Sequence, residues 1–204
     1  MSPHQEDYLK AIYEDVKRFG HSSNKSLAEE LGHAPASVTG MVKRLVEEGL
    51  IRREKTKILL TNEGTALAEE LLRRHRLWEV FLVKTLGYDP DEVHPLAEEL
   101  EHVSDKRLLD RLDDFLHHPA CCPHGSPILG RGTGRTLSLR ELNLGKRATI
   151  SRIDDRHTDF SSLASLGLGL GTEVVRLSEE EFFIGEEKTN LSAFLDDLFV
   201  EEIP

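Results

Sequence analysis

Four side chains with metal-ligating atoms recur at helical spacing in one stretch of the chain. They stand at positions i, i+4, i+7 and i+8, and they are His94, Glu98, Glu101 and His102. Because an α-helix repeats every 3.6 residues, a helix over this stretch places all four on one face. Carboxylates and imidazoles that converge in this way can hold a divalent cation. The alternative is an ordinary solvated acidic face, which such a pattern indicates when nothing accompanies it.

The elements upstream of this stretch have the order of a winged helix. Apolar periodicity and turn residues predict helices over 4–19, 24–31 and 35–48, followed by two short strands, LIRREK and KILLT. A helix, a helix–turn–helix and a β-hairpin in this order form a DNA-binding winged helix. We expect helix 35–48 to lie in the major groove.

The elements downstream change from helical to β-like. A long helix is expected over 62–86 with Asn62 as its cap, and two more over 91–103 and 104–117, the last capped by Ser104. A stretch rich in Gly and Pro follows, and from Thr136 short β-like runs separated by turn residues fit a small antiparallel barrel. The fold class is therefore mainly α with β: an N-terminal winged helix-turn-helix, a helical domain and a small C-terminal barrel.

The net charge of -11 is unevenly distributed along the chain. Residues 1–61 carry ten Lys/Arg and nine Asp/Glu, whereas the remainder carries sixteen and twenty-eight. Residues 43–57 alone hold six basic against three acidic side chains, which is where a DNA reader needs cations. An ordinary solvated surface is the competing interpretation of this cluster.

The sequence also indicates the cellular compartment of the protein. No apolar run approaches the roughly 18 residues of a membrane span, and the first residues lack the basic and apolar regions of a signal peptide. The two cysteines, Cys121 and Cys122, are adjacent and poorly placed to pair with each other. We therefore expect a cytoplasmic protein in a reducing compartment.

The chain resembles the diphtheria toxin repressor family of metal-dependent bacterial regulators over nearly its full length. The matching stretches are DYLKAIY at 7–13, SVTGMVKRLVEEGLI at 37–51, LTNEGTALA at 60–68, RRHRLWEVFL at 73–82 and VHPLAEELEHVSD at 93–105. The resemblance implies the three-domain type. Its parts are a winged helix (1–62), a helical dimerisation and metal-binding domain (63–119), a linker (120–135) and an SH3-like domain (136–204).

The resemblance implies a primary metal site formed by Asp7, Glu98, Glu101 and His102. The iron-responsive branch has methionine at the position of Asp7 and cysteine at that of Glu98, whereas the manganese-responsive branch has carboxylates at both. Three carboxylates and one imidazole suit Mn²⁺ better than sulfur-seeking ions, with Fe²⁺ as the alternative ion. Some short, two-domain manganese regulators carry a further glutamate where this chain has Lys10, so a binuclear site of that kind is not expected.

A second metal site follows from the same resemblance. The family's ancillary site corresponds to His75, Glu79 and His94, and in some manganese-branch members a Cys-Pro-His stretch and an aspartate of the barrel join it. In this chain those additional residues are Cys122, His124 and Asp159. The alternative interpretations are a surface histidine at position 75 and inert linker thiols.

The expected function is a homodimeric, metal-activated repressor of genes for metal homeostasis or transport, not an enzyme. Small polar residues early in the recognition helix suit base contacts, and nearby cations suit phosphates. The set is Ser37, Thr39, Gly40, Lys43, Arg44, Arg52, Arg53, Lys55 and Lys57. Two other functions are a metallohydrolase that uses the His/Glu cluster and a winged-helix regulator of an organic ligand. The sequence contains no HExxH motif and no nucleophile motif of the kind that a metallohydrolase would use.

Overall fold

The computed structural model describes residues 1–128, 131, 136–154 and 158–203. Backbone contacts divide the chain into two compact units. The first comprises Met1–His75 with Glu101–Ser104, and the second comprises Arg76–Leu100 with Asp105–Pro204. Of the three divisions, two fall inside continuous helices and the third follows the second of these helices, so the units share α4 (Asn62–Leu86) and α5 (Val93–Val103). The expected domain boundaries at 62, 119 and 135 stay a prediction.

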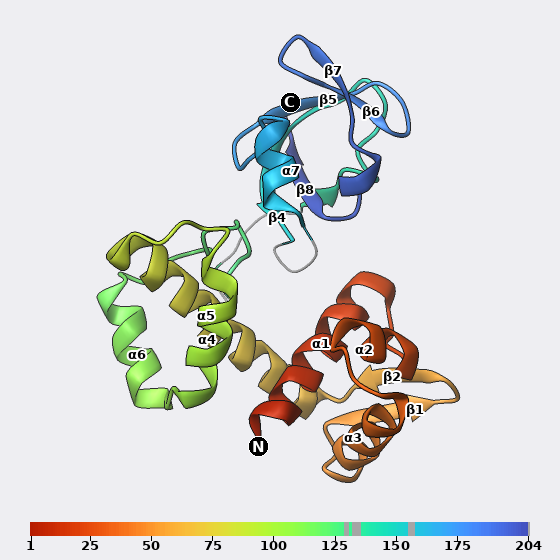
Figure 1. Ribbon diagram of the computed structural model, residues 1–204, viewed down its shortest axis with the longest axis vertical. Coiled ribbons are helices and arrows are strands. Elements are labelled where there is room, and N and C mark those ends of the chain that lie inside the picture. The colour runs from red at the N-terminus through yellow and green to blue at the C-terminus, as the bar shows by residue number, and fades with distance from the viewer. Residues whose placement is uncertain (129–130, 132–135, 155–157, 204) are drawn as a thin grey trace. The chain divides into compact units, whose positions relative to one another are not determined.

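The first unit contains the predicted winged helix (Figure 1). Its elements are α1 (Pro3–Phe19), α2 (Asn24–Glu30), α3 (Pro35–Glu47), β1 (Ile51–Glu54) and β2 (Lys57–Leu60). The Ser23 hydroxyl caps α2 by accepting from the Ser26 amide, and Gly20 ends α1 with a φ of 78°. The apolar faces of the three helices meet in a core that includes Leu9, Ile12, Leu27, Val38 and Leu45.

The hairpin β1–β2 forms the wing, and the next helix begins directly against it. A Cβ atom at Gly64 would lie 1.9 Å from the Leu50 carbonyl oxygen, so only glycine allows α4 to start this close. The Thr61 hydroxyl accepts from the Gly64 amide at 3.1 Å. Thr61, not Asn62, is therefore the side-chain cap of α4, because the helix begins one residue earlier than an Asn62 cap would require.

The helical part of the second unit contains the rest of α4, most of α5 and α6 (Lys106–Phe115). Asp105 caps α6 by accepting from the Leu108 amide at 2.7 Å. The prediction of Ser104 as this cap was wrong by one residue, since a cap bonds the amide three positions later. Leu77 and Val80 of α4 pack with Leu112, Cys122 and Ile128 in a buried cluster.

The C-terminal part of the second unit is a six-stranded antiparallel sheet with the strand order β3-β8-β4-β5-β6-β7, as expected for the SH3-like barrel. The strands are β3 (Leu137–Ser138), β4 (Arg147–Ile153), β5 (Glu173–Arg176), β6 (Glu181–Ile184), β7 (Glu187–Asn190) and β8 (Leu198–Glu202). A short helix α7 (Phe160–Ser165) and a 3₁₀ turn (Ser192–Phe194) connect them. Their core includes Ile150, Val174, Phe182, Leu198 and Val200. No helix in the described ranges is long and apolar enough to cross a membrane.

Candidate metal centres and DNA-binding surface

The structure gathers the four residues expected to form the primary metal site. One ligand atom from each of Asp7, Glu98, Glu101 and His102 lies within 4.8 Å of the others. His102 Nε2 is 3.0 Å from Asp7 Oδ1 and 3.9 Å from Glu101 Oε1. Glu98 stands one turn before His102 on the same helix, α5. Asp7 lies near the start of α1, so residues distant in the sequence meet at this cluster.

This cluster fits a divalent ion. Oxygen and nitrogen ligands lie about 2.0–2.2 Å from such an ion, so two of them stand at most about 4.4 Å apart. The observed 4.8 Å envelope needs only small side-chain rotations to reach that size. Three hard carboxylates with one imidazole suit Mn²⁺ and Fe²⁺.

Glu6 is a further residue of this centre, and the sequence pattern alone did not single it out. Its Oε2 lies 2.7 Å from His102 Nδ1. Because a carboxylate only accepts, His102 Nδ1 donates to Glu6, and Nε2 is the nitrogen that faces Asp7. A carboxylate that orients a ligating histidine in this way is a common second layer of metal sites. The sequence feature that could have identified Glu6 is an acidic residue beside Asp7 in the first turn of α1. The helix dipole also favours an acidic residue there, so the feature does not by itself indicate a metal site.

Glu101 is fully buried and both of its oxygens meet cationic or polar donors. Lys10 Nζ donates to Oε1 at 2.8 Å, and His75 Nδ1 lies 2.8 Å from Oε2. With Nδ1 donating to Glu101, the Nε2 atom of His75 is available as a ligand. Glu101 thus touches a residue of the second site while belonging to the first.

The residues expected at the second site form two overlapping groups that share Glu79. One group is His75, Glu79 and His94, and the other is Glu79, Cys122 and His124. Within each group one ligand atom per residue lies within 4.8 Å of the others. Glu79 is fully buried, with Oε1 at 3.3 Å from His124 Nδ1 and 3.8 Å from His94 Nδ1. Oxygen, nitrogen and sulfur donors together suit a borderline or softer ion than the primary centre does.

A hydrogen bond fixes which nitrogen of His124 can ligate. His124 Nε2 lies 2.7 Å from the Pro90 carbonyl oxygen, which can only accept, so Nε2 carries the proton. The other nitrogen, Nδ1, faces Glu79 and lies 3.8 Å from Cys122 Sγ. The ring is 2% exposed and tilts against Phe160 at a centroid distance of 5.5 Å. The chain therefore presents a lone pair, a carboxylate and a thiol to one buried point.

Asp159, the last expected second-site ligand, lies outside these groups. Its carboxylate caps α7 and accepts from the hydroxyls of Ser161 and Ser162 at 2.6 Å and 2.5 Å. These bonds, led by that from Ser161, lower the pKa of Asp159 from 3.8 to about 2. In the structure this carboxylate therefore acts as the N-cap of α7, and its role as a metal ligand stays a prediction. Cys121 is exposed and belongs to neither described group.

All nine residues expected to meet DNA are exposed on α3 and the wing. Several of the cations already have acidic or polar neighbours: Arg44 pairs with Glu48 at 3.0 Å, and Arg52 pairs with Glu54. The Thr39 hydroxyl donates to the Pro35 carbonyl at 2.8 Å and accepts from Asn24 at 3.0 Å. Thr39 therefore offers a base chiefly its methyl group unless these hydrogen bonds rearrange. The paired arginines would only have to exchange an exposed acidic neighbour for DNA.

Two family models match the two regions of the chain that carry the DNA-binding surface and the metal-ligating groups. Residues 1–59 match the family model described as the N-terminal DNA-binding domain of iron-dependent repressors, and residues 61–130 match their metal-binding and dimerisation domain. The solved structure of the manganese regulator SloR superposes with a TM-score of 0.89 at 34% identity, covering 100% of both chains. The chain belongs to the diphtheria toxin repressor family. It is a metal-dependent, DNA-binding transcriptional repressor with a dimerisation domain and a regulatory site for divalent metal.

Two curated relatives illustrate the range of the family. The transcriptional regulator MntR of Listeria monocytogenes is 35% identical over 58% of this chain and 86% of its own length. The diphtheria toxin repressor of Corynebacterium efficiens is 29% identical over 95% of this chain and 91% of its own. Because this family consists of repressors with a metal-binding domain, the metallohydrolase interpretation is wrong, and an organic effector is not needed to explain the shared architecture.

Proposed function

We propose that this repressor responds to Mn²⁺, with Fe²⁺ as the alternative ion, and acts in the cytoplasm on genes for metal homeostasis or transport. The observation that carries the choice of ion is the donor set of the primary centre, which is three carboxylates and one imidazole with no sulfur. Hard oxygen ligands favour Mn²⁺ over softer ions. SloR, similar over its whole length, is itself described as a manganese regulator.

The switch operates through the pairing of α1 with the end of α5. A bound divalent ion supplies positive charge where three carboxylates converge. Asp7 then holds α1 to Glu101 and His102, and the recognition helix keeps a fixed position in the dimer. Without that charge the carboxylates repel, although Lys10 and the His102–Glu6 bond offset part of the repulsion. Metal thus favours one arrangement over others, as any population shift requires.

The second site tunes or stabilises the protein and does not switch it. Its proposed ligands are His75, Glu79, His94, Cys122 and His124, with Asp159 as the residue from the barrel. The support is the shared, fully buried Glu79 and the fixed orientation of His124. Anomalous diffraction from a crystal soaked in metal should place an ion beside Glu79. Absence of any ion near His75 and Glu79 would remove this site.

DNA recognition is proposed to use α3 in the major groove. Ser37, Thr39 and Gly40 approach the bases, while Lys43, Arg44 and the wing cations touch phosphates. In the dimer, two such helices about 34 Å apart read a two-fold operator.

The dimer interface is proposed to lie around Leu86, α5 and α6, including the exposed face of α6. Leu86, Leu108 and Phe115 are 55%, 43% and 58% exposed although they are large and apolar. Exposed apolar side chains that lie together mark protein–protein contact sites, and aromatic residues are enriched there. Leu108→Glu should shift the protein toward monomer in light scattering. An unchanged dimer mass at micromolar concentration would place the interface elsewhere.

A titration of operator binding against several metals at fixed salt tests the function. Chelator should abolish binding, and added Mn²⁺ should restore it fully. Operator binding that persists in chelator would contradict metal activation. Failure of Mn²⁺ to restore operator binding would contradict the proposed ion.

A further inference from the structure

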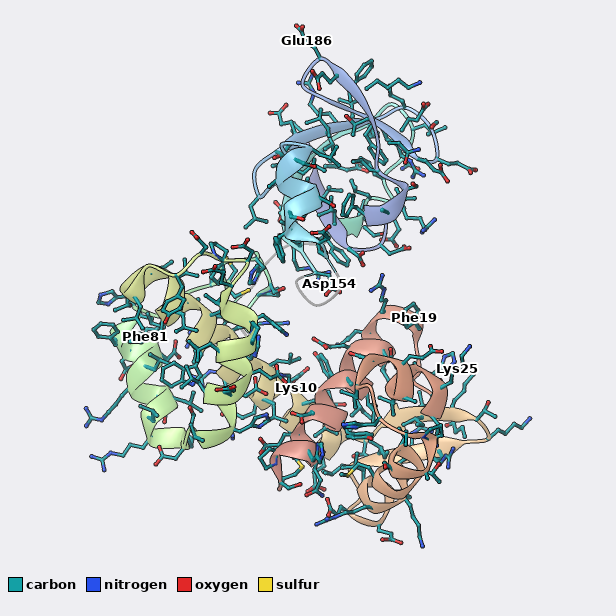
Figure 2. All side chains as sticks on the ribbon, viewed as in Figure 1. Lys10, Phe19, Lys25, Phe81, Asp154 and Glu186 are labelled. Atoms are coloured by element: carbon teal, nitrogen blue, oxygen red, sulfur yellow. The ribbon has the colours of Figure 1, made fainter. Side chains whose placement is uncertain are left out.

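Asn24 joins helix α3 to the wing. It is the first residue of α2, and the next residue, Lys25, marks this end of the helix in Figure 2. Its side-chain Nδ2 donates to the Thr39 hydroxyl at 3.0 Å, and its Oδ1 accepts from the Arg53 guanidinium at 3.1 Å. Thr39 lies on α3 and Arg53 lies on β1. One side chain of α2 therefore contacts two of the residues expected to meet DNA.

The backbone around Asn24 is anchored to its surroundings. Ser22 exchanges two backbone hydrogen bonds of 2.9 Å with Ile58 of β2, which ties the start of α2 to the wing. The hydroxyls of Ser22 and Ser26 donate to the buried Asp15 carboxylate at 2.6 Å and 2.7 Å. A side chain that starts from a fixed backbone loses little further freedom when it forms its own hydrogen bonds.

The bond from Asn24 selects one conformation of Thr39. A threonine in a helix divides between two χ1 rotamers, because its hydroxyl can bond the carbonyl three or four residues earlier. Here the Thr39 hydroxyl donates to the Pro35 carbonyl at 2.8 Å while it accepts from Asn24. A change of rotamer moves the hydroxyl oxygen by about 2 Å, which is enough to break the bond to Asn24. The methyl group of Thr39 is therefore held at one position on the exposed surface of α3.

The second bond of Asn24 orients Arg53 without neutralising it. A guanidinium group has five N–H donors, so Arg53 can bond Asn24 and still contact a phosphate. Its partner here is a neutral amide oxygen, whereas the partners of Arg44 and Arg52 are carboxylates. Asn24 thus places an intact positive charge beside the surface of α3.

We propose that Asn24 is a positioning residue of the DNA-binding surface, which makes Thr39 present its methyl group to a thymine of the operator and orients Arg53 toward a phosphate. The C5-methyl group of thymine lies in the major groove, where a threonine methyl can contact it. The inference rests on the proposed placement of α3 in the major groove, and it goes beyond that placement by naming a residue that sets base preference through another residue. A role in folding alone would change stability and leave base preference unchanged.

The experiment measures base preference with the full-length protein and Mn²⁺. Selection of duplexes from a random pool gives the preferred operator, and Thr39→Ala identifies the thymine that Thr39 contacts. Asn24→Ala should reduce the preference for thymine at that position by on the order of fivefold in competition binding, the low end of what a base contact contributes. The melting temperature should not fall, because alanine suits a helix at least as well as asparagine. Asn62→Ala, the same substitution at the first residue of α4, should match wild type.

Thr39→Val provides a double-mutant cycle with Asn24→Ala. Valine in a helix keeps one rotamer by itself and carries a methyl group in place of the hydroxyl, so the preference for thymine should persist in Thr39→Val. Asn24→Ala should then have no further effect on that preference, because the rotamer no longer depends on a bond to Asn24.

Two results would overturn the inference alone. One is an unchanged preference for thymine in Asn24→Ala when Thr39→Ala loses that preference. The other is an equal loss caused by Asn24→Ala with and without Thr39→Val. If Thr39→Ala leaves the selected operator unchanged, the proposed placement of Thr39 at the bases is itself contradicted, and the inference fails with it.

Discussion

At the scale of single residues, the proposed ligands of the primary centre are held in place by neighbouring side chains. His102 lies between Glu6, at 2.7 Å from Nδ1, and Asp7, at 3.0 Å from Nε2. Glu101 is held by Lys10 and His75. The ligand atoms are thus oriented by the protein before an ion arrives, which lowers the cost of ordering them.

Glu6→Gln tests this orientation. The amide can offer His102 a hydrogen bond but no negative charge, so the imidazole becomes a weaker and less fixed ligand. We expect the affinity of the primary centre for Mn²⁺ to fall about 10- to 100-fold in calorimetric titration, with the fold unchanged. Glu29→Gln, at an exposed position on α2, serves as the control. Equal affinities in the two variants would show that Glu6 does not orient the ligand.

The sequence predicts ligands that share one helix better than contacts between distant residues. His94, Glu98, Glu101 and His102 follow the helical repeat of α5 and could be placed together from spacing alone. The Lys10–Glu101 pair joins residues 91 positions apart. Such a contact depends on how α1 packs, which no local pattern encodes. Asp7 entered the expected site only through resemblance to a known family.

At the scale of elements, the helices were predicted well and the barrel strands only in part. Helices α1 to α6 carry amphipathic patterns with clear stop signals, whereas β7 reads EKTN and has no apolar alternation. Strand β8 and helix α7 were also missed. β8 is held by pairing with β4 and β3, and α7 by the Asp159 cap, so tertiary contacts and a local cap decide these elements.

The Asp159 cap makes α7 sensitive to acid. The pKa of Asp159 in the folded protein is lowered from 3.8 to about 2, so its ionised form stabilises the native state at pH values above about 4. This stabilisation is lost as the pH falls from about 4 toward 2. Asp159→Ala should lower the melting temperature at pH 7 and make it less dependent on pH in this window. A wild-type slope in the variant would assign the acid sensitivity to other groups.

The wing should contribute affinity that depends strongly on salt. Arg52 is exposed on strand β1 and Lys55 is exposed at the turn of the β1–β2 hairpin, where it has a φ of 57°. Arg52→Ala and Lys55→Ala each remove one cation that we propose contacts a phosphate, so each should reduce the slope of log affinity against log salt by about one. Fluorescence anisotropy at several salt concentrations measures this slope. Lys84→Ala, exposed on α4, is the control, and a slope equal to wild type in both wing variants would refute the assignment.

At the scale of the whole molecule, we propose that metal binding and DNA binding are coupled through one ligand from the DNA-binding elements. Asp7 lies on α1, which packs with α2, α3 and the wing strand β2. Glu98, Glu101 and His102 lie on α5, which the family comparison assigns to the metal-binding and dimerisation domain. Removing Asp7 should therefore weaken the coupling while leaving the three ligands of α5 and the residues expected to contact DNA in place.

Operator binding as a function of Mn²⁺ concentration, measured for wild type and Asp7→Ala, tests this coupling most directly. Glu173→Ala, an exposed substitution in the barrel, controls for the loss of a carboxylate. We predict that Asp7→Ala remains a folded dimer but needs at least about tenfold more Mn²⁺ for half-maximal operator binding, since one of four ligands is missing. Operator binding by Asp7→Ala at the Mn²⁺ concentration that suffices for wild type would contradict the account.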